Sequence, residues 1–434
     1  MKTICSVMIG AVFVCLLGLP WKACGEENLT DLRGVWKADF NHNASRIMLQ
    51  MRGGGISLWD VATGKAVCRD FGRGRETDFY ILRPDQKAAL IFFQPRGALL
   101  VDLTTGEPVS PPFDVNALQT DPVNAVFSPD MSTLIAVDRD HSAHVFDTQT
   151  GKLRVDPIPT DAKQPDGTEL VRRAKFTADG AWCFLSDLDG SVVRFDAKTW
   201  KTIGKPIRHP RQEYSQGFDV SADGKWLATF DGGGDHGSRD MLQMWEVETA
   251  KPVGKPINAV EGVTGQFLAE PGRLLIRTGR IGSGGVFELP SGTLRFPIEQ
   301  HDDVYGPAVA VSPDGKWLLS SGHNRFLALQ DASSGEHHSG MSVGCHAGEV
   351  LFAPDSRSCF VVFDNSAFIL EHYYDQYVMR VQLPEMKIDG SIRVLDYIHR
   401  TVLSADGRKL LILQGRTDKE RVTVFDTGTM KAAE

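Results

Sequence analysis

Three short stretches of this 434-residue chain gather residue types that bind metals or partners. The first is a glycine-rich loop that carries Asp231, Asp235, His236, Arg239 and Asp240. Its carboxylates and imidazole could hold calcium, but their spacing is not that of an EF-hand loop, and polar glycine-rich loops are usually just solvated. We therefore predict no metal here and keep Asp231, Asp235, His236 and Arg239 as candidate partner-binding residues.

The second stretch is aromatic and runs from Glu371 to Tyr377. Tyr373, Tyr374 and Tyr377 could anchor a partner, because tyrosine is enriched among the residues that dominate binding energy at protein interfaces. The alternative is that the three rings pack the base of their own long hairpin. Both interpretations stay open at this point, and the three tyrosines join the candidate partner-binding residues.

The third stretch places His337 and His338 close in sequence to Cys345 and His346, which are ligand types for zinc. The two pairs fall on a predicted outer strand and the loop after it, without ligand geometry, so structural histidines are favoured. Position 342 is a serine, so the Cys-x-x-Cys-His pattern of haem attachment is also missing. We predict no metal and no cofactor.

Catalysis would need a nucleophile with a base, paired acids or a phosphate loop. The chain contains no Gly-x-Ser-x-Gly, no His-Glu-x-x-His and no phosphate-loop motif. We therefore assign no catalytic residue.

The elements that position these residues belong to a repeat, best seen in 176–207, which reads FTADGAWCFLSDLDGSVVRFDAKTWKTIGKPI. Each unit predicts four short strands separated by Asp-Gly-type turns. The turn after the first strand and the turn after the third strand both recur with a period of about 45 residues, and both count nine units.

Four-stranded units of this period, repeated radially, predict an all-β β-propeller of antiparallel blades. Nine units predict nine blades, or eight if one unit is degenerate or shares strands with the chain ends; one unit could also be an appendage to the ring. We expect residues 29–35 to pair with the C-terminal strands and so close the ring. Trp182, Trp226 and Trp317 each lie three residues after a turn aspartate, so we expect equivalent sites in three blades.

Segments such as Val126–Asp130, Val220–Trp226, Val311–Trp317 and Ile56–Asp60 resemble WD40 repeats. The resemblance covers most of residues 35–434 and implies a platform that binds protein. The Gly-His pair of WD40 repeats is reduced to His209 and His301, so the hydrogen-bond network typical of WD40 blades should be mostly missing. In the fourth strands, prolines such as Pro206 and Pro256 indicate outer edges, because proline cannot donate to a ladder.

Residues 1–25 read as a secretory signal peptide, with an apolar run, Pro20 and a small-residue cleavage site before Glu26. A lipid anchor on Cys24 is the minor alternative. Residues 26–434 then form a single propeller domain in the periplasm or outside the cell, without a membrane span. Cys68, Cys183, Cys345 and Cys359 remain, and buried thiols are favoured over a disulfide, whose pairing the sequence leaves open.

Removal of the signal takes away Lys2 and Lys22 and leaves 45 basic against 55 acidic residues, a balance that disfavours binding of nucleic acid.

In a four-stranded meander, the turns between the first and second strands and between the third and fourth strands share one face. In this chain those turns are short and uniform. The loops on the other face vary in length, notably at 160–169, 231–240, 371–377 and 415–420. Variable loops usually carry binding, so we expect a non-catalytic platform that binds protein through that face.

The alternative is a propeller enzyme, either a hydrolase or a quinoprotein-like oxidoreductase. Turns such as Asp60–Lys65 and Asp102–Glu107 are similar to those of quinoprotein propellers. Quinoproteins follow this turn with a docking tryptophan, and here the following residues are Ala66 and Pro108. The resemblance therefore stops at the turn itself.

Overall fold

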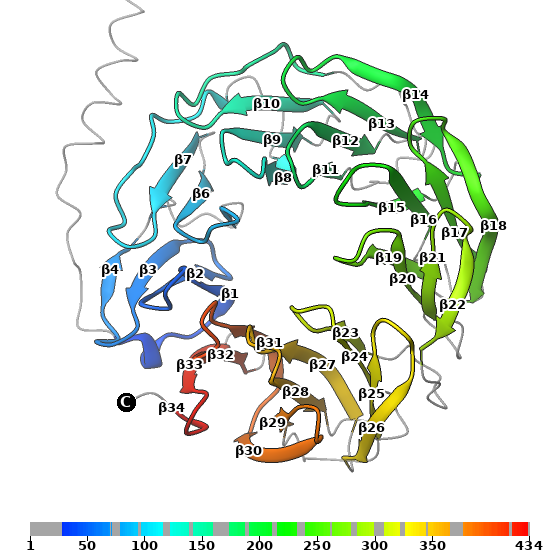
Figure 1. The fold of residues 1–434 in the computed structure, drawn as a ribbon. Coiled ribbons are helices and arrows are strands. Elements are labelled where there is room, and N and C mark those ends of the chain that lie inside the picture. Colours follow the sequence, from blue (N-terminus) through cyan, green and yellow to red (C-terminus); the bar gives the residue numbers. More distant parts are fainter. Residues whose placement is uncertain are drawn as a thin grey trace, which may run out of the picture.

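The structure is a computed structural model that describes residues 28–69, 71, 79–93, 97–115, 122–138, 142–158, 173–186, 191–210, 215–231, 239–260, 263–278, 284–298, 308–321, 326–343, 346–364, 376–415 and 419–432. Nine small antiparallel sheets stand around a central opening (Figure 1). The predicted β-propeller is confirmed, and its blade number is nine.

Each blade is a meander built from one continuous segment of chain, and its first strand is the innermost. Blades 1 to 3 comprise β1 (Val35–Phe40), β2 (Arg46–Met51), β3 (Ile56–Asp60) and β4 (Ala66–Cys68); β5 (Phe79–Leu82), β6 (Ala88–Phe93) and β7 (Gly97–Asp102); and β8 (Pro122–Phe127), β9 (Thr133–Asp138) and β10 (Ala143–Asp147). Blades 4 to 6 comprise β11 (Ala174–Phe176), β12 (Trp182–Ser186), β13 (Ser191–Asp196) and β14 (Thr202–Arg208); β15 (Ser215–Val220), β16 (Trp226–Asp231), β17 (Arg239–Glu246) and β18 (Lys251–Val260); and β19 (Val263–Phe267), β20 (Arg273–Thr278), β21 (Gly285–Glu288) and β22 (Thr293–Pro297). Blades 7 to 9 comprise β23 (Ala308–Val311), β24 (Trp317–Ser321), β25 (Phe326–Asp331) and β26 (His337–Ser342); β27 (His346–Phe352), β28 (Ser358–Asp364), β29 (Gln376–Gln382) and β30 (Lys387–Val394); and β31 (Ile398–Leu403), β32 (Lys409–Gln414), β33 (Arg421–Asp426) and β34 (Lys431–Ala432).

Blades 2 and 3 have a reduced outer edge. In place of a continuous fourth strand, isolated bridges join Phe113 to Ala98 in blade 2 and Ile158 to Ala143 in blade 3. Both edge segments contain proline, which cannot donate to a ladder. Prolines of the longer outer strands β14, β18 and β22 likewise lie on the edge, as the sequence predicts.

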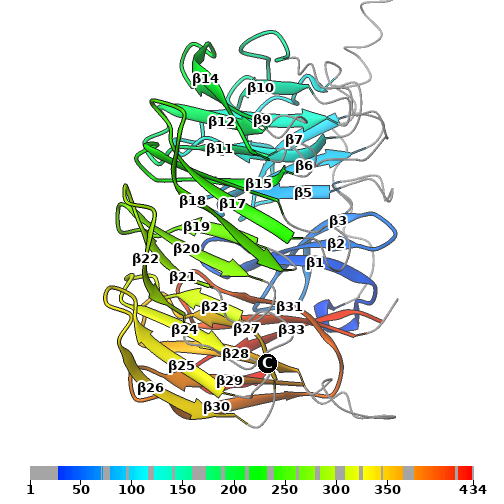
Figure 2. The same cartoon turned by 90° about the vertical axis from the view of Figure 1, so that its right-hand side faces the viewer.

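Two kinds of turn recur from blade to blade, and an aspartate accepts the hydrogen bonds of each in most blades. In the inner turn, between the first and second strands, Asp223 accepts from the Ser221 hydroxyl and the Lys225 N–H, while the serine oxygen accepts from the Trp226 N–H. In the outer turn, between the third and fourth strands, Asp196 accepts from the Thr199 N–H and hydroxyl. These turns lie on one side of the ring, which we call the turn face (Figure 2).

The three tryptophans do occupy equivalent sites, which confirms the repeat alignment. Trp182, Trp226 and Trp317 are each the first residue of a second strand. They lie opposite the acidic residue that ends the third strand of the same blade, Asp196, Glu246 and Asp331 respectively.

Most of the hydrophobic core lies between neighbouring blades. The cluster that joins the first and last blades contains Val35, Phe40 and Trp59 together with Leu411 and Val424. Because each blade presents one apolar side to the preceding blade and the other to the next, burial of both sides requires a closed ring.

Ring closure differs from the expectation. Residues 29–35 were expected to pair with the C-terminal strands, but Leu29–Asp31 form the 3-10 helix η1, and blade 9 uses its own β34 as outer strand. The physical reason is that β34 follows its outer turn directly, so the last unit needs no strand from elsewhere. Packing, one backbone hydrogen bond from Val35 N to Glu420 O (3.2 Å) and polar side-chain contacts join the ends.

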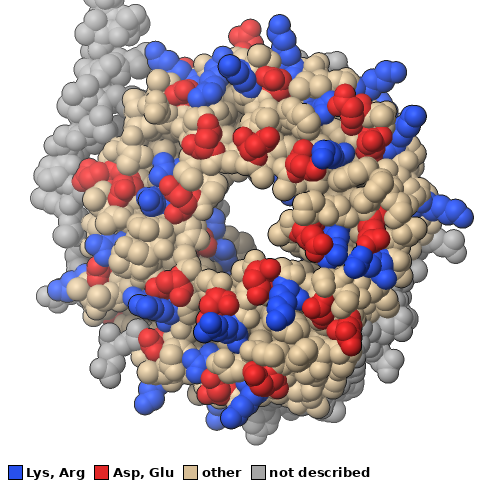
Figure 3. Space-filling view, viewed as in Figure 1, with Lys and Arg blue, Asp and Glu red and all other residues tan. Residues whose placement is uncertain are grey.

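Figure 3 shows an open channel at the centre of the ring. Two buried aspartates on the first strands of their blades bridge adjacent blades. Asp39 of blade 1 accepts from Arg400 of blade 9 (2.8 Å) and from the Tyr80 hydroxyl of blade 2 (2.8 Å). Asp219, at the same repeat position in blade 5, pairs with Lys175 of blade 4 and accepts from a backbone N–H of blade 6. Each carboxylate therefore ties three blades together.

Three of the four expected cysteines are described, and the thiols of all three are buried: Cys68, Cys183 and Cys359. Burial raises the pKa of Cys359 to about 12 and that of Cys183 further above its usual value. Such thiols are unreactive, which agrees with the buried-thiol interpretation. Cys345 lies outside the described residues. Across the described part of the chain, no helix is long and apolar enough to cross a membrane.

Candidate functional site

The face opposite the turns carries the loops between the second and third strands and between blades, and we call it the loop face. Asp231 ends β16 at the base of the first predicted loop, where it is only 2% exposed and accepts from the Met241 N–H. Arg239 is the first residue of β17. Asp235 and His236 lie outside the described residues. Asp231 thus holds its hairpin together, and partner binding by the loop stays a prediction.

A buried polar chain lies in blade 5 beside Asp231. The His209 Nδ1 is 2.7 Å from the Thr229 hydroxyl, which also accepts from the Trp245 indole N–H (2.9 Å). The His209 Nε2 lies 3.9 Å from an Asp231 oxygen. Blade 5 therefore retains a network of the kind that the sequence predicts to be mostly missing. His301 lies outside the described residues.

The same residues resemble a Thr-His-Asp catalytic arrangement, but the geometry argues against chemistry. Thr229, His209 and Asp231 are at most 2% exposed, so no substrate reaches the hydroxyl. The Asp231 carboxylate is also beyond hydrogen-bond distance of the imidazole. The chain of contacts is best explained as a structural element of blade 5.

Tyr377, the described member of the tyrosine group, lies near the start of β29 and faces Phe363 across the strand pair. Its side chain packs against the hydrophobic cluster between blades 7 and 8, which includes Trp317 and Phe363. This placement agrees with the packing alternative for Tyr377. Tyr373 and Tyr374 lie outside the described residues, and their role in binding stays a prediction.

A second set of loop-face residues, which the sequence reasoning missed, lies where blades 9 and 1 meet. We call Trp36, Arg52, Tyr397, His399 and Glu420 the seam cluster. The Arg52 guanidinium lies 4.8 Å from the centroid of the Trp36 ring and donates to the Glu420 carboxylate (2.6 Å). The Tyr397 and His399 rings meet edge to face at 4.9 Å. The bond from Arg52 to Glu420 thus links blade 1 to blade 9.

The cluster is anchored at its base and exposed at its top. Glu420 is 1% exposed, whereas Trp36 is 57% and Tyr397 42% exposed, and the neighbouring Leu395 reaches 70%. Burial alone would raise the pKa of Glu420, but the bonds from Arg52 hold it below its usual value, so the ion pair is present at neutral pH. The available sequence signal was an apolar pair, Leu395 and Tyr397, in a loop rather than a strand.

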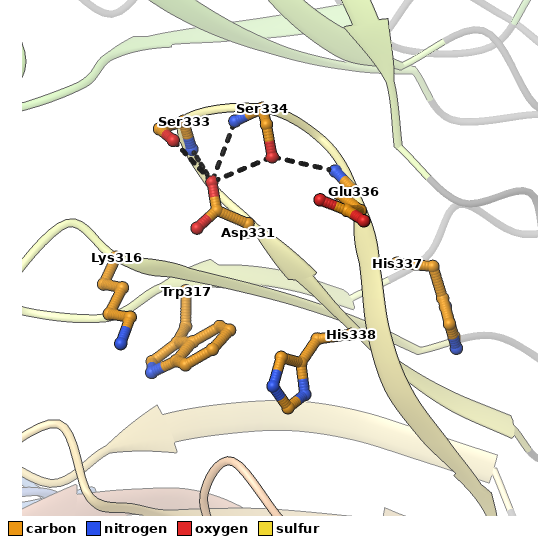
Figure 4. Close-up of a pocket in the computed structure, with 8 residues that line it drawn as sticks. All are labelled: Lys316, Trp317, Asp331, Ser333, Ser334, Glu336, His337 and His338. Atoms are coloured by element: carbon orange, nitrogen blue, oxygen red, sulfur yellow. Dashed lines mark hydrogen bonds between the residues drawn. The ribbon is translucent and has the colours of Figure 1, made fainter.

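The turn face also contains a concavity, at the outer turn of blade 7 (Figure 4). This open pocket has a volume of about 470 Å³, and its lining includes Lys316, Trp317, Asp331, Glu336 and His338. His337 also lines it, so the predicted histidine pair borders this pocket. Among the described residues no group of three or more His, Cys, Asp or Glu could hold a metal ion.

Comparisons with known proteins bear on the fold alone. No family model matches the chain, and no curated protein matches it. A computationally designed protein shares 15% identity at a TM-score of 0.53, with 77% of this chain and 96% of that chain covered. A eukaryotic initiation factor shares 13% identity at a TM-score of 0.57, with 92% and 86% covered. A dihydro-heme d1 dehydrogenase, NirN, shares 16% identity over 78% of this chain and 70% of its own, at a TM-score of 0.49.

Proposed function

We propose that this protein is an exported, non-catalytic platform that binds a protein partner through its loop face, with the seam cluster as the main anchor. The observation that carries the proposal is the exposure of Trp36 and Tyr397 beside the ion pair between Arg52 and the buried Glu420. Tryptophan, tyrosine and arginine dominate interface hot spots, and side chains held by their neighbours lose little entropy on binding. The WD40-like repeats support the same class of function by analogy.

Capture of a partner from a periplasmic or extracellular extract tests the proposal. We expect Trp36→Ala and Tyr397→Ala to weaken capture by about thirtyfold, because hot-spot truncation typically costs about 2 kcal/mol or more. Leu294→Ala is the matched control, since Leu294 is 50% exposed but lies on the outer strand β22, away from the loop face. Thermal unfolding should stay nearly unchanged for all three variants.

Equal capture by the wild type, Trp36→Ala and Tyr397→Ala would show that the seam cluster is not the anchor. The same assay extends to the predicted loops, by replacing Tyr373 and Tyr374 with alanine and by shortening 231–240. Turnover of a generic alcohol or ester that is lost on mutation of a loop-face residue would instead favour the propeller enzyme.

We also propose that the mature protein begins near Glu26 and resides in the periplasm or outside the cell. The support is the apolar run that precedes the small residues Ala23, Cys24 and Gly25. Intact mass of the protein purified from its native compartment should correspond to 26–434. A diacylated Cys24 at the N-terminus would replace this proposal with a lipid anchor.

A further inference from the structure

The pocket of blade 7 is lined by polar atoms that make no hydrogen bond within the turn itself. One oxygen of Asp331 accepts from the N–H and hydroxyl groups of both Ser333 and Ser334. No hydrogen bond from a described residue reaches the second oxygen, which Figure 4 shows on the side of Lys316 and Trp317. The serine hydrogen bonds hold the pKa of Asp331 at about 2, so this oxygen is an ionised acceptor.

Donors border the same space. The Lys316 ammonium lies 4.7 Å from the centroid of the Trp317 ring and within 4 Å of no described carboxylate. His338 meets the Trp317 ring edge to face at 4.9 Å, and its Nδ1 lies 3.2 Å from the Ser339 hydroxyl. That contact leaves the Nε2 of His338 for a ligand. Trp317 is 6% exposed and also lines the pocket.

The mixture of groups selects one class of ligand. The negative charges of two carboxylates, Asp331 and Glu336, disfavour a small anion. No group of three or more His, Cys, Asp or Glu among the described residues is placed to hold a metal ion. A sugar hydroxyl both donates and accepts, so it can bond a carboxylate and an ammonium or imidazole in turn. The volume of about 470 Å³ lies within the range of small-molecule sites. We propose that this pocket binds a neutral saccharide, at a site separate from the loop face.

Blade 5 provides an internal comparison. Its inner turn has the same Asp-Gly-Lys-Trp sequence, ending at Lys225 and Trp226. His337 faces Gln330 across the strand pair of blade 7, and the corresponding residue of blade 5 is Pro252, which faces Trp245. Blade 5 thus has the lysine and the tryptophan of the blade 7 pocket but not its histidines. Lys225 also pairs with Asp223 at 3.4 Å, whereas Lys316 has no such partner within the described chain.

The test uses the full protein on an immobilised panel of neutral tri- and tetrasaccharides, followed by titration in solution of each retained sugar. We expect Lys316→Ala and His338→Ala each to raise the dissociation constant at least tenfold, because each variant loses a hydrogen bond to the sugar. Lys225→Ala is the matched control and should leave the dissociation constant unchanged. Inorganic phosphate, titrated in parallel, should not bind.

Lys316 and His338 are exposed, so both variants should keep the unfolding temperature of the wild type. Three outcomes would overturn the proposal: no saccharide is retained, the pocket variants retain saccharides as well as the wild type does, or phosphate binds and is lost with Lys316→Ala. If the seam variants lose protein capture but still bind saccharide, the seam cluster and the pocket of blade 7 are independent sites.

Discussion

At the scale of single residues, the turn aspartates show how one side chain can shape a blade. Asp331 illustrates the pattern most strongly, because side-chain and backbone donors from two serines converge on one oxygen and lower its pKa to about 2. Desolvation opposes this effect, but the donors outweigh it. The pKa of Asp130 and that of Asp179 are lowered for the same reason, chiefly by hydrogen bonds within their own turns.

These lowered pKa values predict that the folded protein loses stability as the pH falls. An aspartate whose pKa is lower in the folded than in the unfolded chain contributes stability above the unfolded value, about 3.9, and loses it as pH falls through the folded value. We expect the unfolding temperature to be nearly constant above about pH 5 and to fall between about pH 4 and pH 2. Scanning calorimetry against pH measures this directly.

Asp331→Asn keeps the shape and one oxygen acceptor but removes the titration. This variant should therefore lose less stability than the wild type on acidification from pH 4 to pH 2. Parallel curves for the two proteins would contradict the assignment of Asp331.

At the scale of the element, the sequence predicts the repeat well because each turn is encoded locally. Asp223 and its neighbours Ser221 and Lys225 lie within one short segment, so pattern alone locates the strands around them. The prolines likewise identify the outer strands from the sequence alone. The reduced edges of blades 2 and 3 were not predicted, because proline occurs in these segments and in the continuous outer strands alike. Phe113, which bridges to Ala98, packs against Phe146 of the next blade.

Contacts between blades give glycine a role that its turn alone does not explain. Gly151 and Gly315 both adopt a positive φ, of 68° and 71°. A Cβ on Gly151 would lie 2.7 Å from the backbone oxygen of Pro112 in blade 2, whereas a Cβ on Gly315 would meet nothing within 4 Å. The two positions therefore share backbone strain but differ in the clash.

We expect Gly315→Ala to lower the free energy of unfolding by about 1 kcal/mol through strain alone. Gly151→Ala should lose about 2 to 5 kcal/mol, because overpacking against backbone adds to the strain. Urea denaturation of both variants measures the difference. Equal losses would mean that blades 2 and 3 separate easily enough to accept the methyl group.

At the scale of the whole molecule, the sequence could not locate the seam cluster. Arg52 and Glu420 are 368 positions apart, and only closure of the ring brings them together. Local patterns pointed instead to loops of unusual length, of which the described residues Asp231 and Tyr377 turn out to hold structure. Repeats thus reveal the architecture, whereas the contacts at the junction of the chain ends depend on how the ring closes.

That junction differs from every other one, because no peptide bond crosses it. Blades 4, 5 and 6, which Asp219 ties together, are also joined by continuous chain. Asp39 instead bridges blade 1 to blade 9 at the junction, where packing and polar contacts alone resist opening. Loss of Asp39 should therefore promote local opening of the ring, whereas loss of Asp219 should lower stability without separating the ends.

We expect Asp39→Ala to lower the free energy of unfolding by about 2 to 4 kcal/mol, since Arg400 and Tyr80 lose a buried charged acceptor. Hydrogen exchange of β1 and β31 should accelerate more than that of β15 and β19. Asp219→Ala should show the reverse order, and Asp39→Asn, which retains an oxygen acceptor, should fall between Asp39→Ala and the wild type. Uniform acceleration in both alanine variants would mean that the ring opens only by global unfolding, and that the junction of the chain ends is no weaker than the others.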